Sequence, residues 1–263
     1  MRRSLALLTL ALPAALAGAQ TPSAQPEQTP TLEQRLDASG EQAETMRTAL
    51  PSFTCTMNGT SKVLRTQDGA VKKAVAFTGS IRSRRLPSGA LEETHEFSTF
   101  NDKHVNPRAT LPFFVENGFT RVLTYGDSSY QPCYEYTLDE QDSRRVNFTN
   151  GQPFNLACGN FPGTKGFFTF NDAGEVDHVE RRIPAVEDPA WPVPFASVDL
   201  ATVDLGGTPH RLASHMISER IRGKETLRED VRFTDCRLFT TSIRILPADA
   251  GTSSDSTATP PPQ

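Results

Sequence analysis

The side chains most able to do chemistry are concentrated in one stretch of the sequence, GFFTFNDAGEVDHVERRIP, which covers residues 166–184. Five acidic or histidine residues fall within nine positions of it: Asp172, Glu175, Asp177, His178 and Glu180. Carboxylates and an imidazole at such close spacing are typical of divalent-metal sites and of acid–base catalysis. The stretch is therefore either a metal or catalytic site, or the polar side of a hairpin.

The same stretch has the pattern of a β-hairpin. Asp172-Ala173-Gly174 has the composition of a three-residue turn, with Gly174 at the position that requires a positive φ. The register that this turn predicts has four facing pairs: Asn171 with Glu175, Phe170 with Val176, Thr169 with Asp177, and Phe168 with His178.

Alternation along this hairpin separates its reactive side chains. Successive strand residues point to opposite faces, so Asp177 and His178 cannot share one metal ion. We therefore predict a structural hairpin. In it His178 lies beside Phe168 and Phe170, either as a packing residue or as a ligand contact.

Other sequence patterns of catalysis and metal binding are missing. The sequence has no G-x-S-x-G motif, no H-x-x-x-H or C-x-x-C spacing and no calcium-loop pattern. Asp102 and His104 are close together, but in a loop where polar residues are ordinary. We therefore expect a protein that is not an enzyme and that binds no cofactor or metal.

Both ends of the chain differ in composition from a folded domain. Met1–Ala19 has the positive start, apolar core and small-residue cleavage site of a secretory signal peptide. Residues 20–30 and 248–263 are rich in Pro, Gln, Ser and Thr, which is typical of disordered segments. We expect one domain over residues 31–247, in a protein that is periplasmic or secreted.

The charge balance bears on the partners of the exported chain. Loss of residues 1–19 removes two of the 27 basic residues and leaves 25 against 31 acidic ones, a net charge of −6. This balance argues against a nucleic-acid partner. The apolar run of the signal peptide is shorter than the about 20 residues that span a membrane. We expect no transmembrane segment after its cleavage.

The sequence predicts one helix, from Thr31 to Leu50. Thr31 and Gln34 form a capping box, and Pro51 ends the helix. Apolar residues at helical spacing predict one buried face, made of Leu32, Leu36, Ala43, Met46 and Leu50.

After Pro51 the hydrophobic period changes to two, which is typical of strands. SFTCTMNG comes first, and the strands predicted after it are Val71–Arg84, Leu91–Phe100, Phe119–Tyr125, Cys133–Leu138, Arg144–Thr149, Gly166–Asn171, Glu175–Ile183, Ala196–Leu205, Thr208–Ser218, Glu225–Thr234 and Leu238–Leu246. No helices are predicted between them. The fold class is therefore mainly β, with about 11–12 antiparallel strands in a barrel or a sandwich after one N-terminal helix.

The C-terminal half carries three segments in hairpin order: GFFTFNDAGEVDHVERR, VDLATVDLGGTPHRLASHMI and REDVRFTDCRLFTTSIRI. Over about Thr31 to Leu246, the chain resembles the LolA/LolB-like outer-membrane lipoprotein carriers. The resemblance implies an incomplete barrel that wraps helices and encloses an apolar cavity for acyl chains. It implies a non-enzymatic periplasmic carrier of a lipid or other hydrophobic ligand, with a cell-envelope protein as a further partner. The alternative is a structural or interaction module of the cell envelope with a solid barrel core.

Aromatic rings supply the expected lining of such a cavity. They occur in the loop LPFFVENGF, in the proline-rich loop PAWPVPF and in the hairpin that precedes the second loop. Ligand pockets are mostly apolar with a few placed polar groups. The predicted ligand-binding residues are Phe113, Phe114, Phe168, Phe170, His178, Trp191 and Phe195. The alternative is that these rings form a closed core and its covering loop.

Four cysteines in an exported chain, none at metal-binding spacing, predict two disulfides. In the predicted hairpin of residues 133–149, Cys133 lies opposite Thr149, and the loop of Cys158 leaves from that end. We therefore predict a Cys133–Cys158 disulfide.

The remaining pair, Cys55 and Cys236, joins the first strand to a strand near the C-terminus. Val231 and Phe233 alternate away from Cys236. A bulge near Thr234-Asp235 is therefore required if these side chains and Cys55 all face inward.

Overall fold

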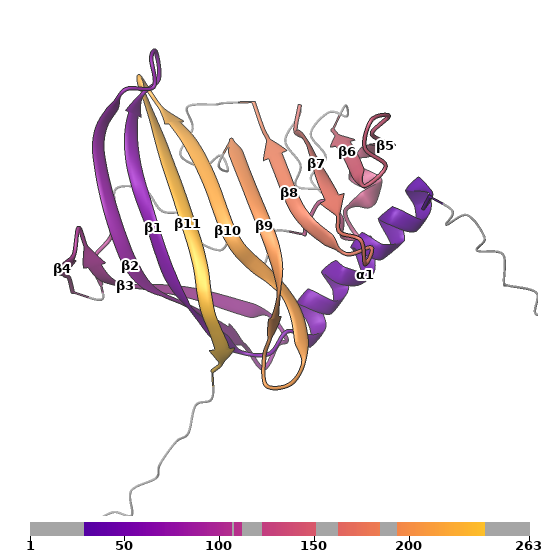
Figure 1. The fold of residues 1–263 in the computed structure, drawn as a ribbon, viewed down its shortest axis with the longest axis horizontal. Coiled ribbons are helices and arrows are strands. Elements are labelled where there is room, and N and C mark those ends of the chain that lie inside the picture. Colours follow the sequence, from indigo (N-terminus) through magenta and orange to yellow (C-terminus); the bar gives the residue numbers. More distant parts are fainter. Residues whose placement is uncertain (1–28, 107, 112–122, 151–162, 185–193, 240–263) are drawn as a thin grey trace, which may run out of the picture.

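The computed structural model describes residues 29–106, 108–111, 123–150, 163–184 and 194–239. These residues form one α-helix, a short 3-10 helix and one antiparallel sheet of eleven strands (Figure 1). In chain order the elements are α1 (Leu32–Ala49), β1 (Phe53–Arg65), β2 (Val71–Arg85), β3 (Leu91–Phe100), β4 (Lys103–His104), the 3-10 helix (Gln131–Cys133), β5 (Glu135–Leu138), β6 (Arg145–Thr149), β7 (Lys165–Phe170), β8 (Val176–Arg182), β9 (Phe195–Asp204), β10 (Pro209–Arg222) and β11 (Glu225–Leu238).

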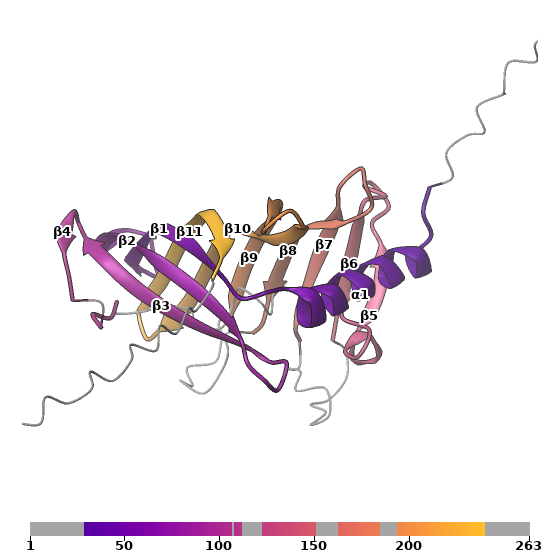
Figure 2. The same cartoon turned by 90° about the horizontal axis from the view of Figure 1, so that it is seen from below.

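The strands follow one another across the sheet in the order β4-β3-β2-β1-β11-β10-β9-β8-β7-β6-β5. The first and last strands, β1 and β11, pair in the middle of the sheet, while β4 and β5 lie at its two ends. The sheet curves but does not close into a barrel (Figures 1 and 2). The prediction of a mainly β, incomplete barrel with an N-terminal helix is confirmed.

The helix forms as its sequence predicts. The Thr31 side chain accepts a hydrogen bond from the Gln34 backbone, and the Gln34 side chain accepts one from the Thr31 backbone, which completes the capping box. Leu50 is the C-cap, directly before Pro51. The buried face is more polar than predicted, because it includes Arg35 and Ser39 beside the apolar residues.

Each face of the sheet has a distinct character. We call the face against which α1 packs the inner face, and the opposite one the outer face; α1 lies across the end of the sheet formed by β5 to β8 (Figure 2). A row of facing residues on β8 to β11 shows the inner pattern, since all four are buried apolar side chains: Val179, Val198, Met216 and Val231. Strand alternation places their immediate neighbours on the outer face.

Three strand predictions fail or cannot be followed fully. In the first, Cys133 belongs to the 3-10 helix, and Glu135 rather than Cys133 faces Thr149, so the predicted register of residues 133–149 is wrong. Leu123–Tyr125, predicted as the end of a strand, forms a turn in which the Gly126 and Asp127 amides donate to the Leu123 carbonyl. The pattern of apolar residues there misled because a turn can also bury alternate side chains. The predicted strand Leu238–Leu246 lies outside the described residues after Phe239, and the short strand β4 was not predicted.

The predicted Cys55–Cys236 disulfide is confirmed, and so is the bulge that it needs. Thr54 faces Arg237 and Thr56 faces Thr234, so the single residue Cys55 lies opposite two residues of β11. One of these two, Asp235, has a φ of 50°, a left-handed conformation that fits the extra residue of a bulge. Cys133 is also disulfide-bonded, and Cys158, its predicted partner, lies outside the described residues.

Candidate functional site

The hairpin of residues 166–184 is present, and its turn is as predicted. The Asn171 amide donates to the Glu175 carbonyl, Phe170 faces Val176, and Gly174 has a φ of 81°. Acidic side chains near the turn are held by local bonds: the Asn171 side chain donates to the Glu175 carboxylate at 3.1 Å. The acidic residues and the histidine within residues 172–180 therefore belong to a hairpin in the structure.

The predicted register beyond the turn is wrong by one residue. Thr169 faces His178 rather than Asp177, and Phe168 faces Val179. The reason is a bulge in β8, where Asp177 is the extra residue and accepts a hydrogen bond from the Thr169 hydroxyl at 2.6 Å. A three-residue turn does not reveal a bulge two positions further on, because the local sequence satisfies both registers.

This shift moves His178 to the outer face. Its ring stacks on Phe167, with 5.5 Å between ring centroids, and its Nδ1 lies 2.7 Å from the Asp199 carboxylate. The structure therefore does not bring His178 to Phe168 and Phe170, and its predicted position beside them is wrong.

Phe168 and Phe170 lie in a cluster of aromatic rings on the inner face. Each is 1% exposed, and their centroids are 5.6 Å apart. Phe148 and Tyr136 each approach the Phe168 ring at 6.3 Å, and the Tyr136 hydroxyl donates to the Tyr125 carbonyl. Burial raises the pKa of Tyr136 above its ordinary value, so this hydroxyl stays uncharged and acts as a hydrogen-bond donor.

The other predicted ligand residues do not join this cluster among the described residues. Phe195 lies on the outer face, three positions from inward-facing Val198, and its ring packs against the Arg182 guanidinium at 4.5 Å. The remaining three, Phe113, Phe114 and Trp191, lie outside the described residues. Ligand binding by the residues named in the sequence analysis stays a prediction.

Polar side chains attach α1 to the sheet. The Gln42 amide makes two bonds to Val176 of β8, accepting from its N–H at 2.8 Å and donating to its carbonyl at 3.1 Å. The Arg35 guanidinium lies over the Phe170 ring, 4.6 Å from the centroid. Burial lowers the pKa of Arg35, and nearby Asp142 opposes that shift. At the other end of α1, Arg85 donates to the Leu50 carbonyl at 2.8 and 2.6 Å.

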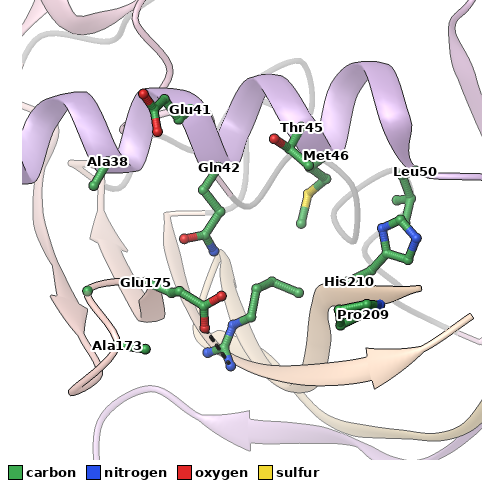
Figure 3. Close-up of a pocket in the computed structure, with 12 residues that line it drawn as sticks. Ala38, Glu41, Gln42, Thr45, Met46, Leu50, Ala173, Glu175, Pro209 and His210 are labelled. Atoms are coloured by element: carbon green, nitrogen blue, oxygen red, sulfur yellow. Dashed lines mark ion pairs between the residues drawn. The ribbon is translucent and has the colours of Figure 1, made fainter. Parts of the chain in front are cut away.

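A pocket of about 390 Å³ lies between α1, the turn of the β7–β8 hairpin and the start of β10 (Figure 3). Its size falls within the roughly 300–1,000 Å³ typical of ligand pockets. The α1 side mixes apolar and polar side chains, and the opposite side carries Glu175, His210 and Arg211. The lining residues are Ala38, Glu41, Gln42, Thr45, Met46, Leu50, Ala173, Gly174, Glu175, Pro209, His210 and Arg211.

Arg211 organises the charged side of the pocket. One of its Nη atoms donates to the carbonyls of Val176 and Leu200 at 3.3 and 2.9 Å, and its side chain is 12% exposed. The other lies 3.8 Å from the Glu175 carboxylate (Figure 3). The guanidinium therefore bonds to the start of β8 and to the middle of β9, and its charge is partly balanced by Glu175.

The pocket residues were not predicted as a site. Gln42 occupies a position that looks solvent-exposed on a helical projection, and Arg211 is one of several arginines on a strand. A weak signal existed in α1, whose spacing of Ala38, Gln42 and Met46 places a small, a polar and an apolar residue along one face. Nothing in the sequence showed which strands this face would meet.

Among the described residues, no three His, Cys, Asp or Glu side chains are arranged to hold a metal ion. In the same part of the chain, no helix has the length and apolar composition needed to cross a membrane. The arrangement of the pocket suits non-covalent binding of a molecule that has apolar and polar parts.

No protein-family model matches the sequence, and no curated protein matches it. Among solved structures, the chain is similar to that of a LolA superfamily protein from Nitrosomonas europaea, with 12% identity, a TM-score of 0.34, and coverage of 79% of this chain and 94% of that one. It is also similar to a DUF1329 family protein from Desulfovibrio piger, with 9% identity, a TM-score of 0.37, and coverage of 78% and 93%. A LolA superfamily protein is thus among the matched structures, in line with the family that the sequence resembles.

Proposed function

We propose that the protein is an exported carrier that binds a lipid, an acyl chain or a similar hydrophobic molecule non-covalently between α1 and the inner face of its sheet. The observation that carries this proposal is that, among the described residues, one helix covers part of a wide apolar face and leaves a pocket between itself and the sheet. The disulfide between β1 and β11 supports export, because such bonds persist in oxidising compartments.

The sheet is much larger than the helix that covers part of it. Eleven strands at about 4.8 Å spacing make a sheet about 48 Å wide. Its longer strands, at 13 to 15 residues and about 3.3 Å per residue, are about 45 Å long. The 18 residues of α1 form a rod about 27 Å long and about 10 Å across. The helix therefore covers well under half of the inner face.

The pocket under α1 fits an amphipathic ligand. Met46, Leu50 and Pro209 offer apolar contacts, while Gln42 and Arg211 offer donors. Burial of apolar ligand surface contributes about 25 cal/mol per Å², so an acyl chain binds without any covalent step. Release requires that contacts between α1 and the sheet open, and these contacts include two hydrogen bonds from Gln42 to β8.

One observation supports the alternative function, a structural module of the cell envelope. Inner-face side chains far from α1, such as Met57 and Ile81, are completely buried. Complete burial suits a structural module of the cell envelope whose core is solid. The two functions differ in whether an added hydrophobic molecule finds space inside.

A pocket-filling substitution tests the carrier proposal. Ala38→Trp places an indole ring in the pocket, so we expect it to weaken binding of a fluorescent fatty acid by at least about tenfold, which is about 1.4 kcal/mol. Ala49→Trp is the matched control, since Ala49 is an exposed residue of the same helix and does not line the pocket. Probe titration of both variants decides, and equal affinities for the two would contradict the proposal.

A further inference from the structure

Four histidine and aspartate side chains form a hydrogen-bonded row across the outer face of the sheet. His178 Nδ1 lies 2.7 Å from Asp199 Oδ1, and Asp199 Oδ2 lies 3.1 Å from His215 Nδ1. The other ring nitrogen of His215, Nε2, lies 2.8 Å from Asp230 Oδ1. The residues belong to β8, β9, β10 and β11 in that order, so the row joins four neighbouring strands.

Two strand irregularities place the histidines in this row. The bulge at Asp177 turns His178 to the outer face, where it faces Asp199. In β10 a second irregularity lies between Ala213 and His215, so that His215 rather than Ser214 faces Asp199. Bulges re-aim side chains in this way and are frequent at functional positions.

The geometry specifies the protonation state of the central imidazole. Carboxylates accept hydrogen bonds but do not donate them, and both nitrogens of His215 lie within bonding distance of a carboxylate. Both bonds exist together only when both nitrogens carry protons. His178 needs a single proton, on Nδ1, to complete its own bond to Asp199.

The row of hydrogen bonds changes the pKa of Asp199. Partial burial by itself raises the pKa of Asp199, but hydrogen bonds from His178 and His215 outweigh it and bring the pKa below its ordinary value. Asp199 therefore stays ionised in mildly acidic medium and supplies both of its oxygens to the row.

Other groups face the row from each neighbouring element. On β11, Arg232 faces His215, and its charge opposes that of the imidazolium. On β8, Glu180 lies two positions from His178 on the same face, and on β10 Glu219 is paired with Arg228. Thr60 of β1 faces Asp230 and Thr169 of β7 faces His178, both uncharged. The His215 side chain is 18% exposed, so salt screens its two ion pairs incompletely.

We propose that this row is a proton-dependent clamp, in which a doubly protonated His215 holds β9, β10 and β11 together and releases them when its imidazole loses a proton. An exported protein meets the pH of its surroundings directly, so such a clamp makes the rigidity of the sheet depend on that pH. The proposal stands on the row alone and is independent of the carrier function.

Linkage determines the direction of the effect. The folded chain holds the second proton of the imidazole with two carboxylates, and the unfolded chain does not. The two bonds therefore add stability while the second proton is held, and this stability is lost when rising pH removes that proton. At the acid end the contribution of Asp199 has the opposite sign, since it is lost as pH falls through its lowered pKa.

The test is the pH dependence of unfolding for matched histidine variants. Urea unfolding in EDTA-containing buffer is expected to show that the folding equilibrium constant of the wild type falls about fivefold between about pH 5.5 and about pH 8 relative to His215→Gln. His104→Gln is the control, because His104 is an exposed residue of β4 outside the row, and it should follow the wild type. Parallel pH profiles for wild type and His215→Gln, or an equal effect of His104→Gln, would overturn the proposal.

A second measurement applies to the unmodified protein, so it does not depend on the folding of a variant. Long-range proton–nitrogen NMR spectra at about pH 5.5, the acid end of the unfolding comparison, are expected to show protons on both ring nitrogens of His215. A neutral imidazole with a single proton at that pH would overturn the clamp, because one of its two carboxylate bonds would then be missing.

Discussion

Removal of the Cys55–Cys236 disulfide is expected to lower the free energy of unfolding by about 5 kcal/mol. The bond closes a loop with a sequence separation of 181, and loop-closure entropy grows with the logarithm of loop length. In the native sheet the bond only reinforces neighbouring strands, since β1 and β11 already pair along their length. The stabilisation therefore acts mainly on the unfolded chain. Urea unfolding of the double variant Cys55→Ala/Cys236→Ala measures it.

The comparison is made without reductant, so that the bond of Cys133 stays intact in both proteins. Circular dichroism of the variant before unfolding shows whether the sheet itself is retained. A loss below about 2 kcal/mol would mean that the unfolded chain is already restricted without the bond, contrary to the entropic account.

Phe168→Ala is expected to destabilise the protein by about 3–5 kcal/mol. The Phe168 ring is 1% exposed and lies among Phe148, Phe170 and Tyr136, so its removal leaves a void that rigid neighbouring rings cannot fill. Chemical unfolding of the variant gives this value directly.

Phe167→Ala is the matched control, one position away on the same strand. Its ring is half-buried on the outer face, where the Arg145 guanidinium covers it at 3.7 Å, so we expect a loss of about 1 kcal/mol. Similar losses for the two variants would contradict the assignment of inner and outer faces. A small loss for Phe168→Ala alone would indicate that this ring lines an open cavity rather than a packed core.

Period-two alternation was sufficient to predict antiparallel strands after one helix, while the open barrel was implied by the family resemblance. The capping box of Thr31 and Gln34 and most of the strands follow from local patterns that one segment contains in full. The Cys55–Cys236 bond was predicted as the remaining pair, and the bulge that it required is present at Asp235.

The site was less predictable, and the hairpin shows why. One extra residue at Asp177 reverses the face of every position after it, and it moved His178 from the inner rings to Asp199. The sequence of the hairpin alone is compatible with both registers. The choice depends on contacts with β9, which lies beyond the proline-rich loop.

The pocket under α1 depends on an even more distant relation. Gln42 meets Val176 across 134 positions of sequence, and Arg211 reaches the same carbonyl from β10. Each is an ordinary polar residue in its own segment. Only the packing of α1 on the sheet brings Gln42, Val176 and Arg211 together.

The most direct test of the carrier proposal is to identify what the exported protein carries. Protein recovered from the periplasm or medium is extracted with organic solvent, and the extract is examined by mass spectrometry beside extracts of Ala38→Trp and Ala49→Trp. The proposal predicts a lipid or acyl chain in near-stoichiometric amount with wild type and Ala49→Trp, and much less with Ala38→Trp. Absence of any hydrophobic molecule from the wild type, together with no binding of an added fluorescent fatty acid, would contradict it and favour the solid core.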